Sequence, residues 1–184
     1  DVIQIGDSQL QFRLKPGQPV PSPNVRMPTV QPREPQPPPP GLVIPGYERY
    51  RLQEVARTTT AVVLKGSPMG GGEPIAVKVL TRVDPYLRDK FGQEGYLLLQ
   101  FKHPHIIRAF ASGQTNGTPY IVMEFCKHGT LHDLLQRQRI TEDLVRLVGR
   151  QTCAALAHAH RYQVVHRDIK PANILFDSPG QLKV

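Results

Sequence analysis

A proline-rich segment divides the chain into two parts of unequal size. Residues 16–45 contain twelve of the nineteen prolines, and the only charged residues among them are Arg26, Arg33 and Glu34. Proline fixes φ and removes a backbone donor, so a stretch such as PREPQPPPP predicts an extended polyproline II spacer and not part of a core. We therefore expect a linker over residues 16–45, with a small folded piece before it and a larger one after it.

The piece before the linker has the pattern of a β-hairpin. In residues 1–15, apolar residues alternate on both sides of a Gly-Asp-Ser turn, at Ile3, Ile5, Leu10, Phe12 and Leu14. Two strands alone are marginal in water, so this hairpin is expected to belong to a larger sheet. The run GDSQLQF after DVIQIG also resembles the closing strands of a forkhead-associated domain, a phosphothreonine-binding β-sandwich. A generic hairpin is the alternative.

Cysteine usage and charge narrow the function classes. Cys126 and Cys153 are the only cysteines and have no CxxC neighbourhood, which disfavours a disulfide framework or structural zinc and favours a reducing, cytoplasmic location.

The net charge of +8 is compatible with nucleic-acid binding, but the basic residues are scattered and not interleaved with aromatics. A solvated basic surface without a nucleic-acid partner is therefore expected. No apolar run approaches the roughly 20 residues that span a bilayer, so we expect no membrane segment in these residues.

From residue 46 onward the pattern is that of a folded domain. Short β-rich runs typical of an antiparallel meander occupy residues 47–56, 60–66 and 74–80. Residues 84–101 predict a helix, weakened by two glycines, whose apolar face carries Leu97, Leu98 and Phe101. Residues 105–125 return to two strands around the turn TNGT.

Residues 141–163 predict a long helix. Thr141 is a plausible N-cap, and the acidic Glu142 and Asp143 suit the positive end of the helix dipole. Apolar residues near helical spacing are Leu144, Leu147, Val148, Ala154, Leu156 and Ala157. The helix is expected to deliver the following segment, VVHRDIKPANIL, to a buried position. Strands with one helix followed by mainly helical sequence predict an α+β arrangement in two lobes.

The segment HRDIKPAN supplies the groups that phosphoryl transfer requires. That reaction needs a carboxylate near the attacking hydroxyl, cations on the phosphates and ligands for magnesium. Asp168 would accept or orient the hydroxyl proton, Lys170 would meet the transferring phosphate, and Asn173 would bind Mg²⁺ through its amide oxygen. The segment resembles the catalytic loop of protein kinases, in the version with Lys that serine/threonine kinases have. His166 is then expected to pack as a support of the loop, and not to bind metal.

The resemblance extends upstream to the parts that would hold ATP. IAVK resembles the third-strand motif of the kinase small lobe, which implies that Lys78 binds the α and β phosphates and pairs with Glu94. It also implies that Val55, Val63 and Ala76 press on the adenine from one side.

The run YIVMEFCKHGTL resembles the hinge between the kinase lobes. Met123 would guard the back pocket, and backbone groups of Glu124 and Cys126 would hydrogen-bond the adenine. Leu175 would form the floor beneath it. The two-lobe protein-kinase fold would then have its small lobe over about residues 46–126 and the start of its large lobe over 127–184.

The sequence departs from the family at the loop that covers the phosphates. In ARTTTAVV, all three glycines of G-x-G-x-x-G-x-V are replaced, by Ala56, Thr58 and Ala61. Glycine lets backbone N–H groups approach the phosphates. Losing one or two such bonds, at roughly 1.5 to 3 kcal/mol each, would weaken nucleotide binding by about ten- to a thousandfold, although threonine hydroxyls could recover part of it.

The resemblance implies a bacterial-type serine/threonine protein kinase, of which these residues are expected to be a fragment. After LKV the family continues into the D-F-G motif and the activation loop, and neither is among the 184 residues. In the intact protein, the γ-phosphate of ATP would pass to a Ser or Thr hydroxyl of a protein substrate. Arg167 suggests control by activation-loop phosphorylation. The alternative is a pseudokinase, a binding or scaffold module without turnover.

Overall fold

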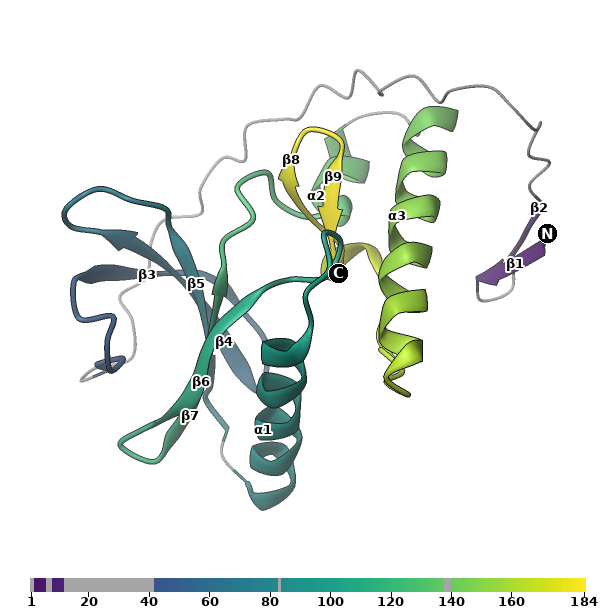
Figure 1. Ribbon diagram of the computed structural model, residues 1–184. Helices are drawn as coiled ribbons and strands as arrows, with labels where there is room; N and C mark the ends of the chain where they lie inside the picture. Colours follow the sequence, from purple (N-terminus) through teal and green to yellow (C-terminus); the bar gives the residue numbers. More distant parts are fainter. Residues whose placement is uncertain (1, 6–7, 12–41, 83, 138–139) are drawn as a thin grey trace.

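The computed structural model describes residues 2–5, 8–11, 42–82, 84–137 and 140–184 (Figure 1). The polyproline II spacer predicted over residues 16–45 lies almost entirely outside the described residues. None of the described helices is long and apolar enough to cross a membrane.

Strands β1 (Val2–Ile5) and β2 (Ser8–Gln11) pair antiparallel where the sequence predicts a hairpin, with Val2 opposite Gln11. The predicted continuation through Phe12 and Leu14 lies outside the described residues. The resemblance to a forkhead-associated domain stays a prediction.

A five-stranded antiparallel sheet occupies the part of the chain where the sequence predicts a meander. Its strand order is β3-β4-β5-β7-β6, and the strands are β3 (Tyr50–Arg57), β4 (Ala61–Pro68), β5 (Ile75–Leu80), β6 (Ala109–Thr115) and β7 (Thr118–Glu124). Along β5 the side chains alternate between two cores: Val77 and Val79 enter one, while Ala76 and Leu80 enter the other. Lys78 shares the second face, which a helix covers.

The sharp turn between β6 and β7 confirms the prediction from TNGT. Asn116 and Gly117 both have positive φ, 48° and 75°, as a type I′ hairpin turn requires. In β3, a register shift between Glu54 and Ala56 leaves Val55 as the extra residue of a β-bulge.

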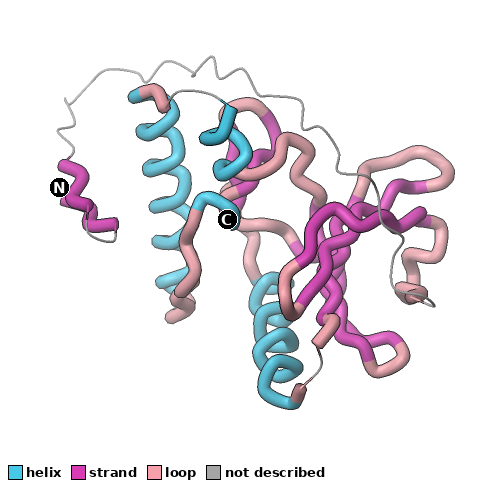
Figure 2. Tube along the Cα trace, turned by 180° about the vertical axis from the view of Figure 1, so that it is seen from behind, coloured by secondary structure: helices cyan, strands magenta, loops and turns pink. Residues whose placement is uncertain are grey.

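Helix α1 (Pro85–Gln100) packs on β6 and β7, as Figures 1 and 2 show from opposite sides. Asp84 caps it by accepting the N–H of Leu87 at 2.9 Å. Phe101 is buried as predicted, and Leu97 and Leu98 are half-buried. Gly95, which the sequence suggested as a weakness of the helix, is buried at the contact with the sheet.

The rest of the described chain forms a mainly helical unit. It contains α2 (Leu131–Arg137), α3 (Glu142–Arg161), the 3₁₀ turn η1 (Pro171–Asn173), and the hairpin of β8 (Leu175–Ser178) with β9 (Gln181–Lys183). The sequence patterns had not indicated α2 or the β8–β9 hairpin. The core of this unit contains Leu131, Leu134, Leu144, Leu147, Ile174, Phe176 and Leu182.

Helix α3 bears out the predicted N-cap but not the whole predicted apolar face. The Thr141 hydroxyl accepts the N–H of Leu144 at 3.2 Å. Ala157 is exposed, which corrects the prediction, and the neighbouring Ala155 and Ala159 are buried instead. The reason is that α3 meets the end of α1 and the following loop along this face, through Phe101 and Ile106.

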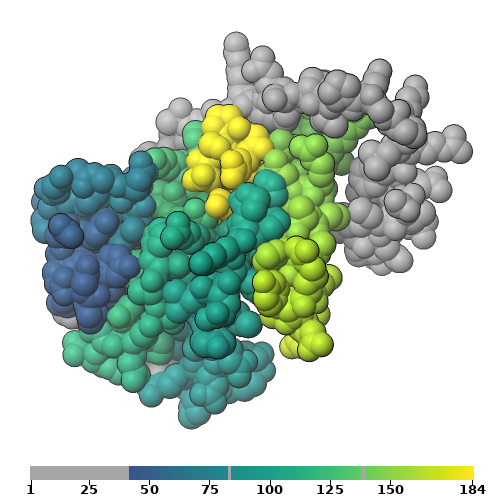
Figure 3. Space-filling view, viewed as in Figure 1, coloured from purple at the N-terminus to yellow at the C-terminus, as the bar shows by residue number. Residues whose placement is uncertain are grey.

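The loop that follows α1 also joins the sheet half to the helical half through backbone bonds. The N–H of Ile107 donates to the carbonyl of Val184 at 3.1 Å, and the N–H of Val184 donates to the carbonyl of His105 at 3.0 Å. In Figure 3 the yellow residues of the β8–β9 hairpin lie directly against the neighbouring green and teal segments. These contacts fix the helical half, with its 165–174 loop, against the sheet.

Candidate active site

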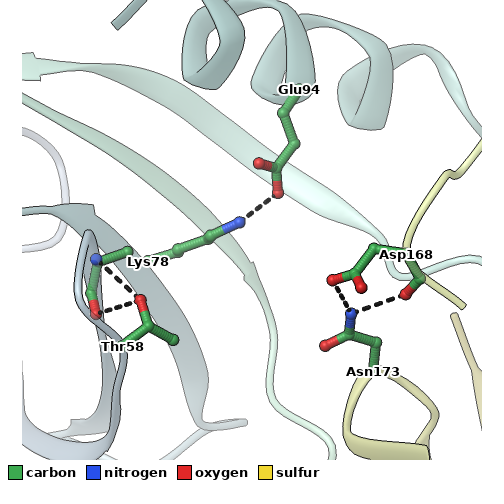
Figure 4. Close-up of polar contacts among 6 residues, drawn as sticks. Thr58, Lys78, Glu94, Asp168 and Asn173 are labelled. Carbon is green, nitrogen blue, oxygen red and sulfur yellow. Dashed lines mark hydrogen bonds and ion pairs between the residues drawn. The ribbon is translucent and has the colours of Figure 1, made fainter. Parts of the chain in front are cut away.

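Lys78 and Glu94 form the ion pair that the sequence predicts. The distance from Lys78 Nζ to Glu94 Oε1 is 2.6 Å, and Figure 4 shows the two side chains pointing toward one another from β5 and α1. The pairing follows from the fold, because Lys78 lies on the sheet face that α1 covers. Both side chains keep partial exposure, 30% and 42%, so the ammonium remains accessible to a ligand. Lys78 also lies over the ring of Phe91, 5.6 Å from its centroid.

The apolar residues assigned to the adenine occupy different environments. Ala76 and Met123 are buried in the core beneath α1, and Val63 packs against that core. Val55, in the bulge, is 41% exposed. Leu175 is half-buried at the start of β8 and bridges to Thr130.

The predicted hinge begins at the end of β7, where Glu124 is held by hydrogen bonds and an ion pair. Its backbone N–H donates to the carbonyl of Arg108 at 2.9 Å, so this N–H is not a free donor for adenine. Its carboxylate accepts the N–H of Arg108 at 2.7 Å and pairs with Lys183 Nζ at 2.8 Å. Two residues on, Cys126 is buried, and burial raises the pKa of its thiol to about 12.

The predicted catalytic residues meet at one carboxylate. Asp168 Oδ2 accepts from Lys170 Nζ at 2.8 Å and from Asn173 Nδ2 at 2.7 Å, and the same amide nitrogen donates to the Asp168 carbonyl at 2.9 Å. Asn173 is placed at the end of η1, next to the buried Ile174. Because its amide nitrogen is committed to Asp168, the amide oxygen is the atom left to bind a cation.

The electrostatics of this loop keep Asp168 ionised. The Lys170 ammonium, followed by the Asn173 amide, holds the pKa of the Asp168 carboxyl below its usual range. Desolvation lowers the pKa of His166, opposed by the negative charges of Asp168 and Glu94. Glu94 is therefore within electrostatic reach of this loop, which brings the Lys78 pair and the Asp168 cluster to one region, as Figure 4 also shows.

The loop itself is exposed, which corrects the expectation that the α3 helix delivers it to a buried position. Residues 165–172 are all exposed, although the 3₁₀ turn at their end contacts α2. His166 supports the loop by a hydrogen bond and not by packing, since its Nδ1 accepts the N–H of Asp168 at 3.3 Å. Arg167 adopts φ of 62° and is also exposed.

A metal site is only partly present in the described residues. No group of three or more His, Cys, Asp or Glu residues there could hold a metal ion. The Asn173 amide oxygen is one suitable ligand for Mg²⁺, which prefers oxygen donors and takes several from water and phosphates.

The turn that replaces the glycine-rich loop folds onto its own backbone. The Thr58 hydroxyl accepts the N–H of Ala61 at 3.0 Å and donates to the Ala61 carbonyl at 3.2 Å. The possibility that threonine hydroxyls stand in for lost phosphate contacts is therefore not favoured at Thr58. The sequence alone did not indicate this turn, nor the pairing of Glu124 with Lys183, because both depend on where side chains point in the fold.

Comparison with known proteins places this geometry in a family. The sequence matches the protein kinase domain family over residues 51–184. Serine/threonine protein kinase OSK3 of Oryza sativa subsp. indica is 38% identical over 117 residues, covering 61% of this chain and 23% of the relative. CBL-interacting protein kinase 19 of Oryza sativa subsp. japonica is 34% identical over 151 residues, covering 78% and 28%. Hormonally up-regulated neu tumor-associated kinase homolog of Xenopus tropicalis is 36% identical over 129 residues, covering 67% and 18%.

A solved structure agrees with these relatives in fold. The crystal structure of Rad53 1-466 in complex with AMP-PNP matches with a TM-score of 0.65 and 28% identity, covering 75% of this chain and 38% of that one. The chain spans 18% to 28% of the length of the three curated relatives, which come from plants and an animal, so the bacterial type stays a prediction. The family match covers the sheet, α1, the hinge and the Asp168 loop, and the chain belongs to the protein kinase domain family.

Proposed function

We propose that the protein containing these residues is a serine/threonine protein kinase, which transfers the γ-phosphate of ATP to Ser or Thr hydroxyls of protein substrates. The observation that carries this proposal is the convergence of Lys170 and Asn173 on the carboxylate of Asp168. Lys170 in this loop favours Ser and Thr over Tyr as acceptors, by the resemblance stated above. The family membership of residues 51–184 supports the same reaction class.

The proposed roles follow from charge and position. A carboxylate with a lowered pKa is ionised at neutral pH, so Asp168 would orient the acceptor hydroxyl and take its proton late in the reaction. Lys170, on the same carboxylate, would neutralise charge on the transferring phosphate. Lys78, held by Glu94, would position the α and β phosphates of ATP.

Mg²⁺ is the second cofactor of this proposal. Asn173 would supply one ligand through its amide oxygen, and nucleotide phosphates and water would supply others. When bound, the ion would neutralise phosphate charge.

The test is Asp168→Asn in the full-length protein. Because the carboxylate is lost while the shape is kept, we expect phosphoryl transfer to a Ser/Thr peptide to fall by at least about a hundredfold, with ATP binding retained. The matched control is Asp143→Asn, which removes an exposed charge in the first turn of α3 and should leave the rate unchanged. Equal rates in both variants would contradict the assignment of Asp168.

A noncatalytic scaffold is the second candidate, and one observation favours it. The turn between β3 and β4 has no glycine and binds its own backbone donors. If the full-length protein phosphorylates no substrate and loses nothing on Asp168→Asn, this candidate replaces the first.

Further features of the proposal concern the setting of the protein. We retain a cytoplasmic location, a bacterial type and a forkhead-associated domain before the linker as predictions from the sequence. We also predict that the protein does not bind nucleic acid, because its basic residues are scattered along the sequence. Tight binding of an oligonucleotide that weakens steeply with salt would overturn that last prediction.

A further inference from the structure

The turn between β3 and β4 is closed by a side chain as well as by the backbone. The N–H groups of Thr60 and Ala61 both donate to the hydroxyl oxygen of Thr58, at 3.3 and 3.0 Å. The hydroxyl donates to the carbonyl of Ala61 at 3.2 Å, and the N–H of Thr58 donates to the same carbonyl at 2.8 Å. Figure 4 shows the Thr58 hydroxyl turned onto the backbone, with dashed lines for its two bonds to Ala61. One side chain therefore occupies two backbone donors of the turn.

The same turn is also tied to the neighbouring strand. The carbonyl of Thr60 accepts the N–H of Thr81 at 2.8 Å and the N–H of Arg82 at 3.3 Å, just beyond the end of β5. None of residues 58–61 has a positive φ, so the turn uses conformations that need no glycine. The chain thus replaces a glycine-rich loop by a turn that is held on two sides.

This arrangement bears on nucleotide binding if the chain binds ATP as proposed above. In protein kinases the loop between these two strands covers the phosphates, and its N–H groups are donors to them. Here a phosphate would first have to displace the Thr58 hydroxyl from the N–H groups of Thr60 and Ala61. A bond gained by displacing an existing bond adds less affinity than a bond to a donor that faces water.

We propose that Thr58 limits how much the phosphates contribute to nucleotide affinity, by holding the N–H groups of Thr60 and Ala61 in the turn. Binding then depends chiefly on the adenine contacts and on Lys78. The N–H groups of the turn add little to phosphate binding, so this chain distinguishes ATP from adenosine less well than a chain with an open loop.

The test compares ATP and adenosine binding to the full-length protein by calorimetry, without Mg²⁺, in Thr58 variants. Thr58→Val keeps the shape and charge but removes the hydroxyl, so the ratio of ATP to adenosine affinity should rise about tenfold. Thr58→Ser keeps the hydroxyl and should keep the wild-type ratio. Thr59→Val makes the same change one residue on, where the described structure shows no side-chain hydrogen bond, and should also leave the ratio unchanged.

The outcomes separate this inference from the proposed function. If adenosine and ATP bind but Thr58→Val leaves their ratio unchanged, the role of Thr58 is wrong and nucleotide binding stands. If no variant binds either ligand, ATP binding by this chain fails and the inference fails with it. A tenfold rise that also occurs in Thr59→Val would overturn the inference, because the effect would then come from side-chain polarity in general.

Amide hydrogen exchange supplies a readout that does not depend on any ligand. The N–H groups of Thr60 and Ala61 should exchange faster in Thr58→Val than in wild type, and at the wild-type rate in Thr58→Ser. Unchanged exchange in Thr58→Val would show that the hydroxyl does not hold these donors, and would overturn the inference.

Discussion

Glu124 has structural contacts that its predicted place in the hinge does not require. Its carboxylate accepts the backbone N–H of Arg108 and pairs with Lys183 of β9, so it joins the end of the sheet to the helical half. The side chains of Lys183 and Glu124 are only 9% and 21% exposed. A charge in such a place cannot recover its hydration when its partner is removed, so the loss of either member is costly.

We expect Lys183→Met to lower the free energy of unfolding by about 2 to 4 kcal/mol, because it leaves the Glu124 carboxylate half-buried without its cation. Urea denaturation of the 184-residue chain measures this. The control is Lys127→Met, which breaks the pair of Lys127 with Glu73 at 2.5 Å, whose side chains are 49% and 81% exposed. That change should cost less than about 0.5 kcal/mol. If both variants lower the free energy of unfolding equally, burial does not determine how much these ion pairs contribute to stability.

At the scale of elements, α1 lies close to the sheet because of one glycine. A Cβ added at Gly95 would lie 2.2 Å from Ser112 Oγ and 3.2 Å from Ile121 Cγ1, so only glycine fits there. Gly92, one turn earlier, faces open space. The close approach matters for the site, because the adjacent Glu94 reaches Lys78 from this helix.

The two glycines should therefore respond oppositely to alanine. Gly95→Ala forces α1 away from β6 and should lower the free energy of unfolding by about 1 to 3 kcal/mol. Gly92→Ala adds a better helix former at an exposed position and should raise it by about 0.5 to 1 kcal/mol. Urea denaturation of both variants compares them directly. If Gly95→Ala stabilises the chain as much as Gly92→Ala, the packing described for α1 is wrong.

The sequence predicted those elements whose determining residues are close to one another in the chain. The type I′ turn at Asn116 and Gly117 and the N-cap at Thr141 are examples. Gln151 shows the limit, because it is buried in α3 with its amide donating to the Gly180 carbonyl at 2.7 Å and accepting the Leu182 N–H at 2.8 Å. Those partners lie 29 and 31 residues away, beyond any local periodicity.

In the candidate site, too, some contacts could be predicted from the sequence and others could not. Motif spacing pointed to Lys78 with Glu94 and to Asp168 with its neighbours, and the structure brings each group together. Their roles in catalysis stay predictions. Neither the inward turn of the Thr58 hydroxyl nor the partner of Glu124 could be predicted, because each depends on side-chain direction and on contacts between the two halves.

Across the whole molecule, the two halves meet at a cluster of aromatic rings. His103 and His158 have ring centroids 4.8 Å apart, and Phe101, His105 and Tyr162 complete the cluster. Burial lowers the pKa of His103, and the charges of His158, His105, Arg161 and Lys183 lower it further. The folded chain therefore holds His103 neutral at a pH where an unfolded chain would protonate it.

Stability should accordingly fall on mild acidification. The unfolded chain binds more protons than the folded one below about pH 6.5, so the free energy of unfolding decreases from there until the pH passes the lowered pKa of His103. His103→Gln should make the loss between pH 7.5 and 5.5 smaller, without removing it, because the pKa of His166 is lowered too. Urea midpoints across this range measure the slope, with His132→Gln on the exposed side of α2 as control. An unchanged slope in His103→Gln would contradict this origin.

The burial of Cys126 also makes the two cysteines chemically distinguishable. Alkylating reagents react with thiolates, and a thiol whose pKa is raised to about 12 forms almost none at neutral pH. Cys153 is exposed on α3. A maleimide fluorophore should therefore attach at Cys153 alone in the native chain, giving a singly labelled protein for binding titrations without mutating Cys126.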